Sequence, residues 1–352
     1  MKIRTCLLML AFVFAAGSVD AGDDAAADTT VAALLDEQAQ DEYRDWLNAL
    51  SARFASREDA EGLLSAVIFS DARTLGEPIN TRAASKLLVE RAMHAAIAET
   101  HLPALNLLMT MGAQVADPAV LAEVRAHLRM HDAGNANIWM HELGLIAAGD
   151  DAAEAAVFAK LAQADHHHVF LRAAMPKLVE HAMTIPMPEA HRAMASRELG
   201  ADQPELSVGV LAMSMMMARA MPAMNDLRTR CRRDDAHIDG RLRAEHCVRI
   251  AKALAGNSDS VLFELFGLNI WNERSAHRPD AHLAYQAWRD HAWQLQAYSE
   301  LRTGATQLEV QALNRREMQA MVSGRGERDS VQDELRAAGI PLTASADWQP
   351  SR

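Results

Sequence analysis

The chain has 352 residues, of which 50% are apolar and 5% aromatic, and its formal net charge at pH 7 is −12. An acidic chain without a clear basic stripe is a poor match for nucleic acid, because proteins bind nucleic acid by neutralising its phosphates. The same charge disfavours binding to an anionic membrane surface. The length suits an extended helical array better than one small compact domain.

The N-terminus has the pattern of a secretory signal peptide over residues 1–21. A basic region at residues 2–4 is followed by an apolar run at 6–16, and the small residues of "VDA" (19–21) fit a signal-peptidase site. The run is shorter than the ~20 residues that a membrane-spanning helix needs, although an uncleaved anchor is the alternative. We therefore expect a periplasmic or secreted protein with no stable membrane insertion after signal removal.

Beyond the signal, apolar residues recur at helical spacing, and no run alternates convincingly with the period of a strand. The segment "DPAVLAEVRAHLRMH" is an example. Asp117 can cap a helix that has Pro118 at its first position, and Val120, Val124 and Leu128 form an apolar stripe. The pattern predicts an all-α chain.

Three parts of the chain repeat the order helix, short Asp-containing turn, helix. Their turns are at residues 56–59, 149–151 and 256–259. Each such helical hairpin would bury one face against its neighbours. We therefore expect an irregular α-solenoid of antiparallel helical hairpins.

One of these hairpins has a more specific pattern within residues 135–168. It combines a tryptophan, a Leu-Gly pair, a Gly-Asp pair and spaced alanines, at Trp139, Leu143, Gly144, Gly149, Asp150, Ala155, Ala159, Ala162 and Asp165. This segment resembles a degenerate tetratricopeptide unit. The resemblance implies a concave surface that binds a protein or peptide, and it implies no catalytic residues.

Turn-forming breaks divide the rest of the chain, and a soft boundary falls near residues 185–204. The flanking ends are polar and have no periodic partner, so we expect them to be flexible. The expected organisation is a signal peptide at 1–21, a flexible linker at 22–30, an N-terminal helical-repeat region at 31–185, a C-terminal helical region at 186–340 and a flexible tail at 341–352.

Two cysteines, Cys231 and Cys247, remain after signal cleavage, and the polar turn "DDAHIDG" lies midway between them. A helical hairpin centred on that turn would bring the two thiols to the same height. In an oxidising compartment this predicts a disulfide. By closing a loop in the unfolded chain, such a bond would stabilise the fold by ~3 kcal/mol. Two reduced, buried thiols are the alternative. A catalytic redox pair is not indicated, because there is no Cys-x-x-Cys motif.

Three consecutive histidines in "DHHHVF" (165–170) raise the possibility of a metal site. If Asp165 caps a helix, the three side chains fan apart by ~100° per residue and do not converge on one ion. A polar turn between helices is therefore the favoured interpretation, with His168 as the local metal candidate. His127 and His131 are a second candidate pair, four residues apart on one helical face.

The segment "LAMSMMMARAMPAM" (211–224) is rich in methionine, whose thioether is a soft ligand suited to Cu(I). Met213 and Met217 are the candidates here. However, the methionines continue a stripe with helical spacing, which is typical of a buried helix face. We favour the core interpretation and keep copper or zinc binding as an alternative function.

The segment 283–301 is aromatic in a chain that is otherwise poor in aromatic residues. Tyr285 and Trp288 share one helical face, and Trp293 points elsewhere. With Tyr298, these residues are the candidate ligand-binding side chains, because large aromatics at helix surfaces often mark interfaces.

The chain contains neither Gly-x-Ser-x-Gly nor His-Glu-x-x-His, and no dinucleotide or phosphate-binding loop. We therefore expect no catalysis and no cofactor. The leading hypothesis is an exported scaffold that binds an envelope protein or peptide. A cell-envelope hydrolase without a recognisable motif is a further alternative.

Overall fold

Every regular element in the described part of the chain is a helix, which confirms the predicted all-α fold. The computed structural model describes residues 37–72, 86–113, 115–147, 150–209, 224–232, 238–276 and 278–349. The predicted signal peptide and linker, together with Met213 and Met217, lie outside these ranges. Among the helices within them, none combines the length and the apolar character needed to cross a bilayer.

The N-terminal half of the described chain is a succession of seven helices. They are α2 (Glu37–Ala55), α3 (Ala60–Ala72), α4 (Lys86–Ala98), α5 (Leu102–Gly112), α6 (Pro118–His131), α7 (Ala136–Leu143) and α8 (Asp151–Leu161). The start of α6 is as predicted. The Asp117 carboxylate accepts a hydrogen bond from the amide of Ala119 at 2.9 Å, and Pro118 takes the first helical position.

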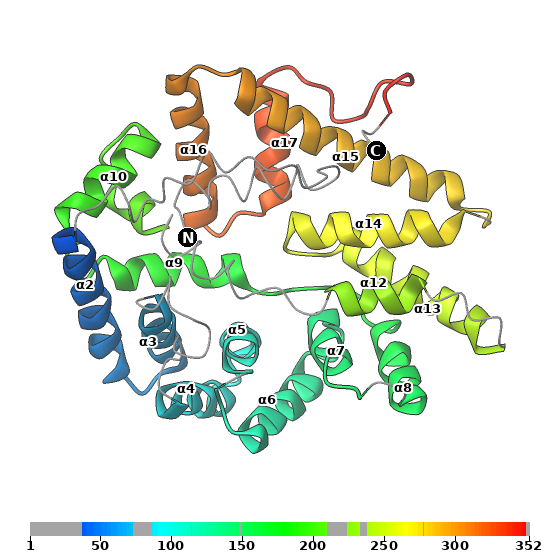
Figure 1. Ribbon diagram of the computed structural model, residues 1–352, viewed down its shortest axis with the longest axis horizontal. Helices are drawn as coiled ribbons and strands as arrows, with labels where there is room; N and C mark the ends of the chain where they lie inside the picture. The colour runs from blue at the N-terminus through cyan, green and yellow to red at the C-terminus, as the bar shows by residue number, and fades with distance from the viewer. Residues whose placement is uncertain are drawn as a thin grey trace.

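The C-terminal half contains eight further helices in its described residues, among them the longest, α15. They are α9 (Leu171–Ala182), α10 (Glu189–Leu199), α12 (Met224–Arg232), α13 (Ile238–Gly256), α14 (Val261–Ser275), α15 (Ala281–Gly304), α16 (Gln307–Val322) and α17 (Glu327–Ala337). A capping box between Thr306 and Glu309 fixes the start of α16. In Figure 1 the helices α2 to α8 run along one edge of the molecule and α15 to α17 lie along the other, with α9 between them.

Several helices that are distant in the sequence pack together. Helix α9 contacts α3, α5 and α16, and α10 contacts both α2 and α16. In a regular solenoid each repeat contacts only its neighbours. The predicted solenoid stacking of hairpins is therefore not confirmed.

The largest hydrophobic cluster shows why these distant helices stay together. It joins buried residues of α2 to α6 with α9, α10 and two methionines of α16, Met318 and Met321. The cluster thus includes side chains from both sides of the boundary expected near 185–204. The helices of the two expected regions share one core.

A second cluster joins α7 and α8 to α12, α13 and α14, and it contains the cysteine pair. Helices α13 and α14 lie close together at Gly267, where an added Cβ would lie 2.7 Å from the backbone oxygen of Ala251. A third, smaller cluster lies on α15 and α17. Ile340, just before the C-terminal tail, and Leu342, within the tail, pack against it.

Candidate functional site

The four aromatic side chains predicted as a ligand site all lie on α15, but in different surroundings. Tyr285 is 38% exposed, and its hydroxyl donates a hydrogen bond to the side-chain oxygen of Gln349. The ring of Trp288 lies 5.9 Å from that of Tyr285, and its indole nitrogen donates to Asn269 of α14 at 2.8 Å. These two rings therefore form one aromatic patch beside the C-terminal tail.

Trp293 faces the C-terminal tail directly. Its indole nitrogen donates to the carbonyl oxygen of Pro341 at 2.7 Å, and its ring meets that of Trp348 edge to face at 5.6 Å. The tail was predicted from the sequence as a flexible segment at 341–352. In the structure, residues 341–349 lie along α15.

Polar side chains of α15 hold the backbone of this tail. Gln294 donates to the carbonyl oxygen of Leu342 at 2.8 Å, and the Asp290 carboxylate accepts a hydrogen bond from the amide of Ala344 at 3.1 Å. Arg289 donates to the carbonyl oxygens of two further tail residues, Ser345 and Trp348. These three α15 residues were not among the candidates predicted from the sequence. Arg289 and Asp290 lie four and three residues before Trp293, and this helical spacing was the available signal.

Tyr298, the fourth aromatic candidate, is only 3% exposed and does not belong to this surface. Its hydroxyl accepts a hydrogen bond from Arg302, which also pairs with Glu317 at 2.8 Å and bonds Asn314. Burial raises the pKa of Tyr298 and also that of Glu317. This buried polar network lies beneath a cleft between α9, α16 and α17.

The cleft has a volume of about 450 Å³. We call it the α9–α17 cleft. It is lined by Tyr298 and Glu317 at the network, by Arg172 of α9 and by side chains of α16 and α17. At one end Arg316 and Glu334 form a two-point ion pair at 2.6 and 2.7 Å, which bridges α16 and α17.

The histidine segment is not the start of a helix, so the supposed capping role of Asp165 is wrong. Helix α9 begins only at Leu171, after Phe170 adopts a left-handed conformation with φ of 61°. Isolated bridges pair His166 with Asn135 and His167 with Ser258. The segment is therefore an extended strip between two loops, 132–135 and 257–260.

His167 is fully buried in this strip. Its Nδ1 lies 3.1 Å from the hydroxyl of Ser258, and its ring packs 4.0 Å from that of Phe263. No hydrogen-bond partner reaches Nε2 from the described residues. Burial lowers the pKa of His167 to about 3, so the ring is neutral at pH 7.

The two flanking histidines meet carboxylates instead. His166 lies between Asp165, at 2.6 Å, and Asp132, at 3.1 Å. Asp259 accepts hydrogen bonds from the backbone amides of Val169 and Phe170 at 3.0 and 2.7 Å, next to His168. Burial nevertheless raises the pKa of Asp259 above its usual value. These contacts tie the loops together.

The candidate metal ligands do not assemble into a metal centre in the described residues. The rings of His127 and His131 lie 4.3 Å apart, but across the described ranges no group of three histidine, cysteine or acidic side chains is placed to hold an ion. His168 contributes its backbone to Asn135. Met213 and Met217 lie outside the described residues.

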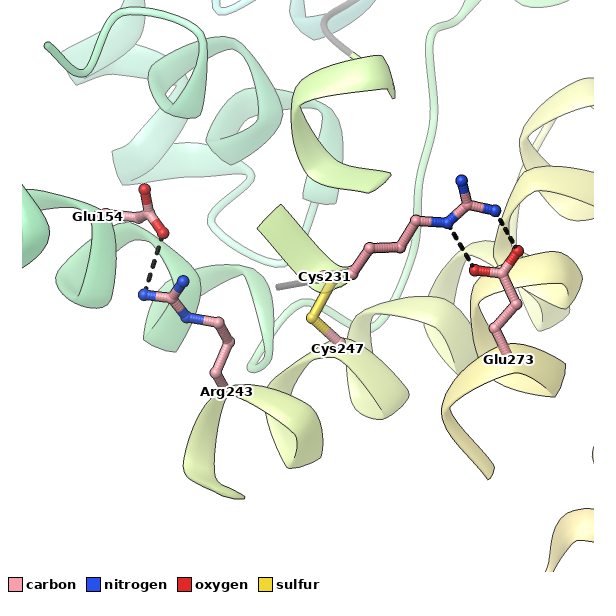
Figure 2. Close-up of a disulfide and its surroundings, with 6 residues drawn as sticks. Glu154, Cys231, Arg243, Cys247 and Glu273 are labelled. Carbon is pink, nitrogen blue, oxygen red and sulfur yellow. Dashed lines mark hydrogen bonds and ion pairs between the residues drawn. A yellow bond between two sulfur atoms is a disulfide. The ribbon is translucent and has the colours of Figure 1, made fainter. Parts of the chain in front are cut away.

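The predicted disulfide between Cys231 and Cys247 is present, with the two Cα atoms 5.8 Å apart. It joins α12 to α13, and ion pairs flank it on both sides (Figure 2). On one side Glu154 of α8 pairs with Arg243 at 3.1 Å, and on the other Glu273 of α14 pairs with Arg232 at 2.7 Å. Glu154 also pairs with Arg230.

Three glutamates are buried among the described residues, and each faces basic side chains. Glu154 and Glu317 each face an arginine. Glu264 of α14 lies 3.5 Å from Arg328 and 3.8 Å from the Nδ1 of His291. Burial raises the pKa of Glu264 to about 7 and lowers that of His291 to about 4. In the described part of the chain each buried glutamate thus faces a nitrogen base or a cation.

Comparison with known proteins identifies no relative. No family model matches the chain, and neither a curated protein nor a solved structure is similar to it. The tetratricopeptide resemblance of residues 135–168 therefore has no support from a family model. In the structure, α7 and α8 of this segment pack together as a short hairpin.

Proposed function

We propose that the protein is an exported, non-catalytic module that binds an extended segment of an envelope protein or peptide along α15. The observation that carries this proposal is the way α15 holds residues 341–348. Arg289, Asp290, Trp293 and Gln294 bond to backbone groups of that segment. Every peptide has such backbone groups, so this mode of binding tolerates different sequences.

The aromatic rings would add affinity to this backbone recognition. Trp293 contacts the ring of Trp348, and the exposed Tyr285 bonds the side chain of Gln349. Edge-to-face aromatic pairs are worth about 0.5–1.5 kcal/mol beyond the area that they bury. We infer that the preferred partner segment is extended and carries an aromatic residue at the position of Trp348.

The C-terminal tail would act as a built-in competitor at this surface. A tethered segment has an effective concentration in the millimolar range, so a partner peptide must bind more tightly than the tail does. Gly339, with φ of +72°, lies between α17 and the tail and permits the turn there. The proposed regulation is displacement of the tail by the partner.

Two further observations support the location of this function. The pattern of residues 1–21 is that of a signal peptide. The disulfide between Cys231 and Cys247 is of the kind that persists in oxidising compartments. We therefore place the proposed binding partner in the cell envelope or outside the cell.

The test uses a fluorescent peptide with the sequence of residues 340–352 and two forms of the protein, the full chain and a variant that ends at Gly339. Fluorescence anisotropy should show binding to the shortened variant and at least tenfold weaker binding to the full chain. Circular dichroism should show the same helical content in both forms. The proposal fails if the folded shortened variant does not bind the peptide.

A matched pair of substitutions in the shortened variant sharpens this test. Trp293→Phe removes the hydrogen bond to the backbone and should weaken binding, whereas Arg44→Ala, an exposed arginine of α2 that pairs with Asp41, should leave it unchanged. Pull-down from envelope extracts with the shortened variant would then identify the natural partner. Competition of that partner with the fluorescent peptide would locate its site on α15.

A further inference from the structure

The α9–α17 cleft contains a buried cation that has no carboxylate partner in the described chain. Arg172 is 7% exposed and lines the cleft. Its Nη1 donates to the carbonyl oxygen of Arg325 at 2.6 Å, and none of the ion pairs in the described ranges includes it. A carbonyl oxygen satisfies one of five N–H donors and does not neutralise the charge. Buried arginines are normally paired.

The other charged groups around the cleft have partners within the protein. Arg316 pairs with Glu334, Arg325 pairs with Asp333, and Glu317 pairs with Arg302 beneath the cleft. The carboxylate of Glu327 accepts a hydrogen bond from the first amide of α14. Arg172 contributes to the electrostatic environment of Glu317, but the two do not form an ion pair. Arg172 is therefore the cation that remains for a ligand.

We propose that the α9–α17 cleft is a binding site for an organic carboxylate, which forms its ion pair with Arg172. A guanidinium presents parallel donors that match the two oxygens of a carboxylate. The cleft, of about 450 Å³, has the size of a small-molecule site. Ala320, Val331 and Ala337 supply apolar surface for the rest of the ligand.

The acidic groups of the cleft disfavour a ligand that carries two negative charges. Three arginines and four carboxylates line it: Arg172, Arg316, Arg325, Glu317, Glu327, Asp333 and Glu334. A dianion such as phosphate would meet repulsion from these acidic groups. A monocarboxylate adds one charge, which Arg172 compensates. The carboxylate can come from a free small molecule or from the C-terminus of a peptide, and this site is independent of the α15 surface.

The experiment is isothermal titration of the full chain with matched probes. They are N-acetylalanine, N-acetyl-trialanine, the C-terminal amide of each, and inorganic phosphate. The proposal expects the acids to bind and each amide to bind at least tenfold more weakly, with phosphate below the acids. Tighter binding of the tripeptide acid would identify a peptide C-terminus as the source. Equal binding of acids and amides, or binding of no acid at millimolar concentration, would overturn the proposal.

Variants of the full chain test the role of Arg172. Arg172→Gln should abolish acid binding. Arg172→Lys keeps the positive charge but loses the two parallel N–H donors of the guanidinium, so it should weaken acid binding at least tenfold. Arg44→Gln is the control, because this arginine of α2 is exposed and neither it nor its partner Asp41 lines the cleft. Circular dichroism checks folding. If Arg172→Gln does not fold, the acid affinity of Arg172→Lys is the test. An affinity equal to that of the wild type would contradict the proposal.

Discussion

The buried histidine of the "HHH" segment connects its own strip to the loop at 257–260 and to helix α14. His167 reaches Ser258 and Phe263, about ninety residues further along the sequence, and its backbone amide donates to the carbonyl oxygen of Asn257. Its ring has to be neutral to stay buried. At the scale of single residues, this makes the histidine a source of acid sensitivity.

Substitution of this histidine should change the pH dependence of stability. The folded-state pKa of His167 is about 3, against an ordinary value of 6.5, so between these pH values only the unfolded chain binds the proton. Stability therefore falls as pH falls below 6.5, by up to about 1.4 kcal/mol per pH unit for one proton. His167→Asn should remove that contribution, as measured by urea unfolding between pH 7 and 5. His94→Asn, which removes an exposed histidine, should follow the wild-type slope.

Glu264 should affect the pH dependence of stability in the opposite direction to His167. Burial raises its pKa from 4.5 to about 7, so the folded state keeps a proton that the unfolded state has lost. Its contribution to stability is present at low pH and is lost as pH rises through 7. Glu264→Gln should therefore gain stability relative to wild type between pH 5 and 8, by up to about 3 kcal/mol. A difference that stays constant across this range would contradict the shifted pKa.

Packing between helices α13 and α14 depends on one glycine. A Cβ at Gly267 would come within 2.7 Å of backbone atoms of both Ala251 and Ala255. Gly267→Ala should therefore destabilise the protein by roughly 1–3 kcal/mol, because backbone cannot yield as a flexible side chain can. Gly256→Ala is the matched control, since nothing lies within 4 Å of its added Cβ. Thermal unfolding would compare the melting temperatures of the two variants. Equal melting temperatures would contradict the close approach of α13 and α14 at Gly267.

The disulfide should stabilise the hairpin of α12 and α13. Cys231 and Cys247 are buried and sixteen residues apart, so removal of the bond should cost ~3 kcal/mol. Urea unfolding of a variant with both cysteines changed to serine would measure this loss. In native wild-type protein, thiol reagents should find no reactive cysteine. Two thiols titrated without denaturant would show that the bond is absent.

Contacts between residues close in the sequence could be predicted better than contacts between distant residues. The cap at Asp117 and the disulfide across "DDAHIDG" were predictable, because each partner lies within one helix start or one hairpin. The site of Arg172 was not, because its cleft comes from helices more than 120 residues further along. The partner of Trp293 was equally hidden, since residues 341–349 carry no periodic pattern that assigns them to α15.

At the scale of the molecule, the shared hydrophobic core predicts cooperative unfolding. Met318 and Met321 of α16 are buried among helices of the N-terminal half. Met321→Ala should cost about 2–5 kcal/mol and lower the melting temperature of the whole chain in one transition. Far-ultraviolet circular dichroism and tryptophan fluorescence should report the same midpoint. Two transitions, of which only one shifts, would mean that the halves unfold separately. Met130→Ala, at an exposed methionine, is the control.

The contact of α16 with the largest hydrophobic cluster also affects the order in which the chain folds. The apolar faces of α2 to α6 emerge during synthesis long before α16, which carries two of the side chains that cover them, Met318 and Met321. Contacts over such long sequence separations slow folding and leave partly formed states exposed to aggregation. The cluster of α2 to α6 therefore stays incompletely covered until α16 has been made, a period in which chaperones can bind its uncovered surface.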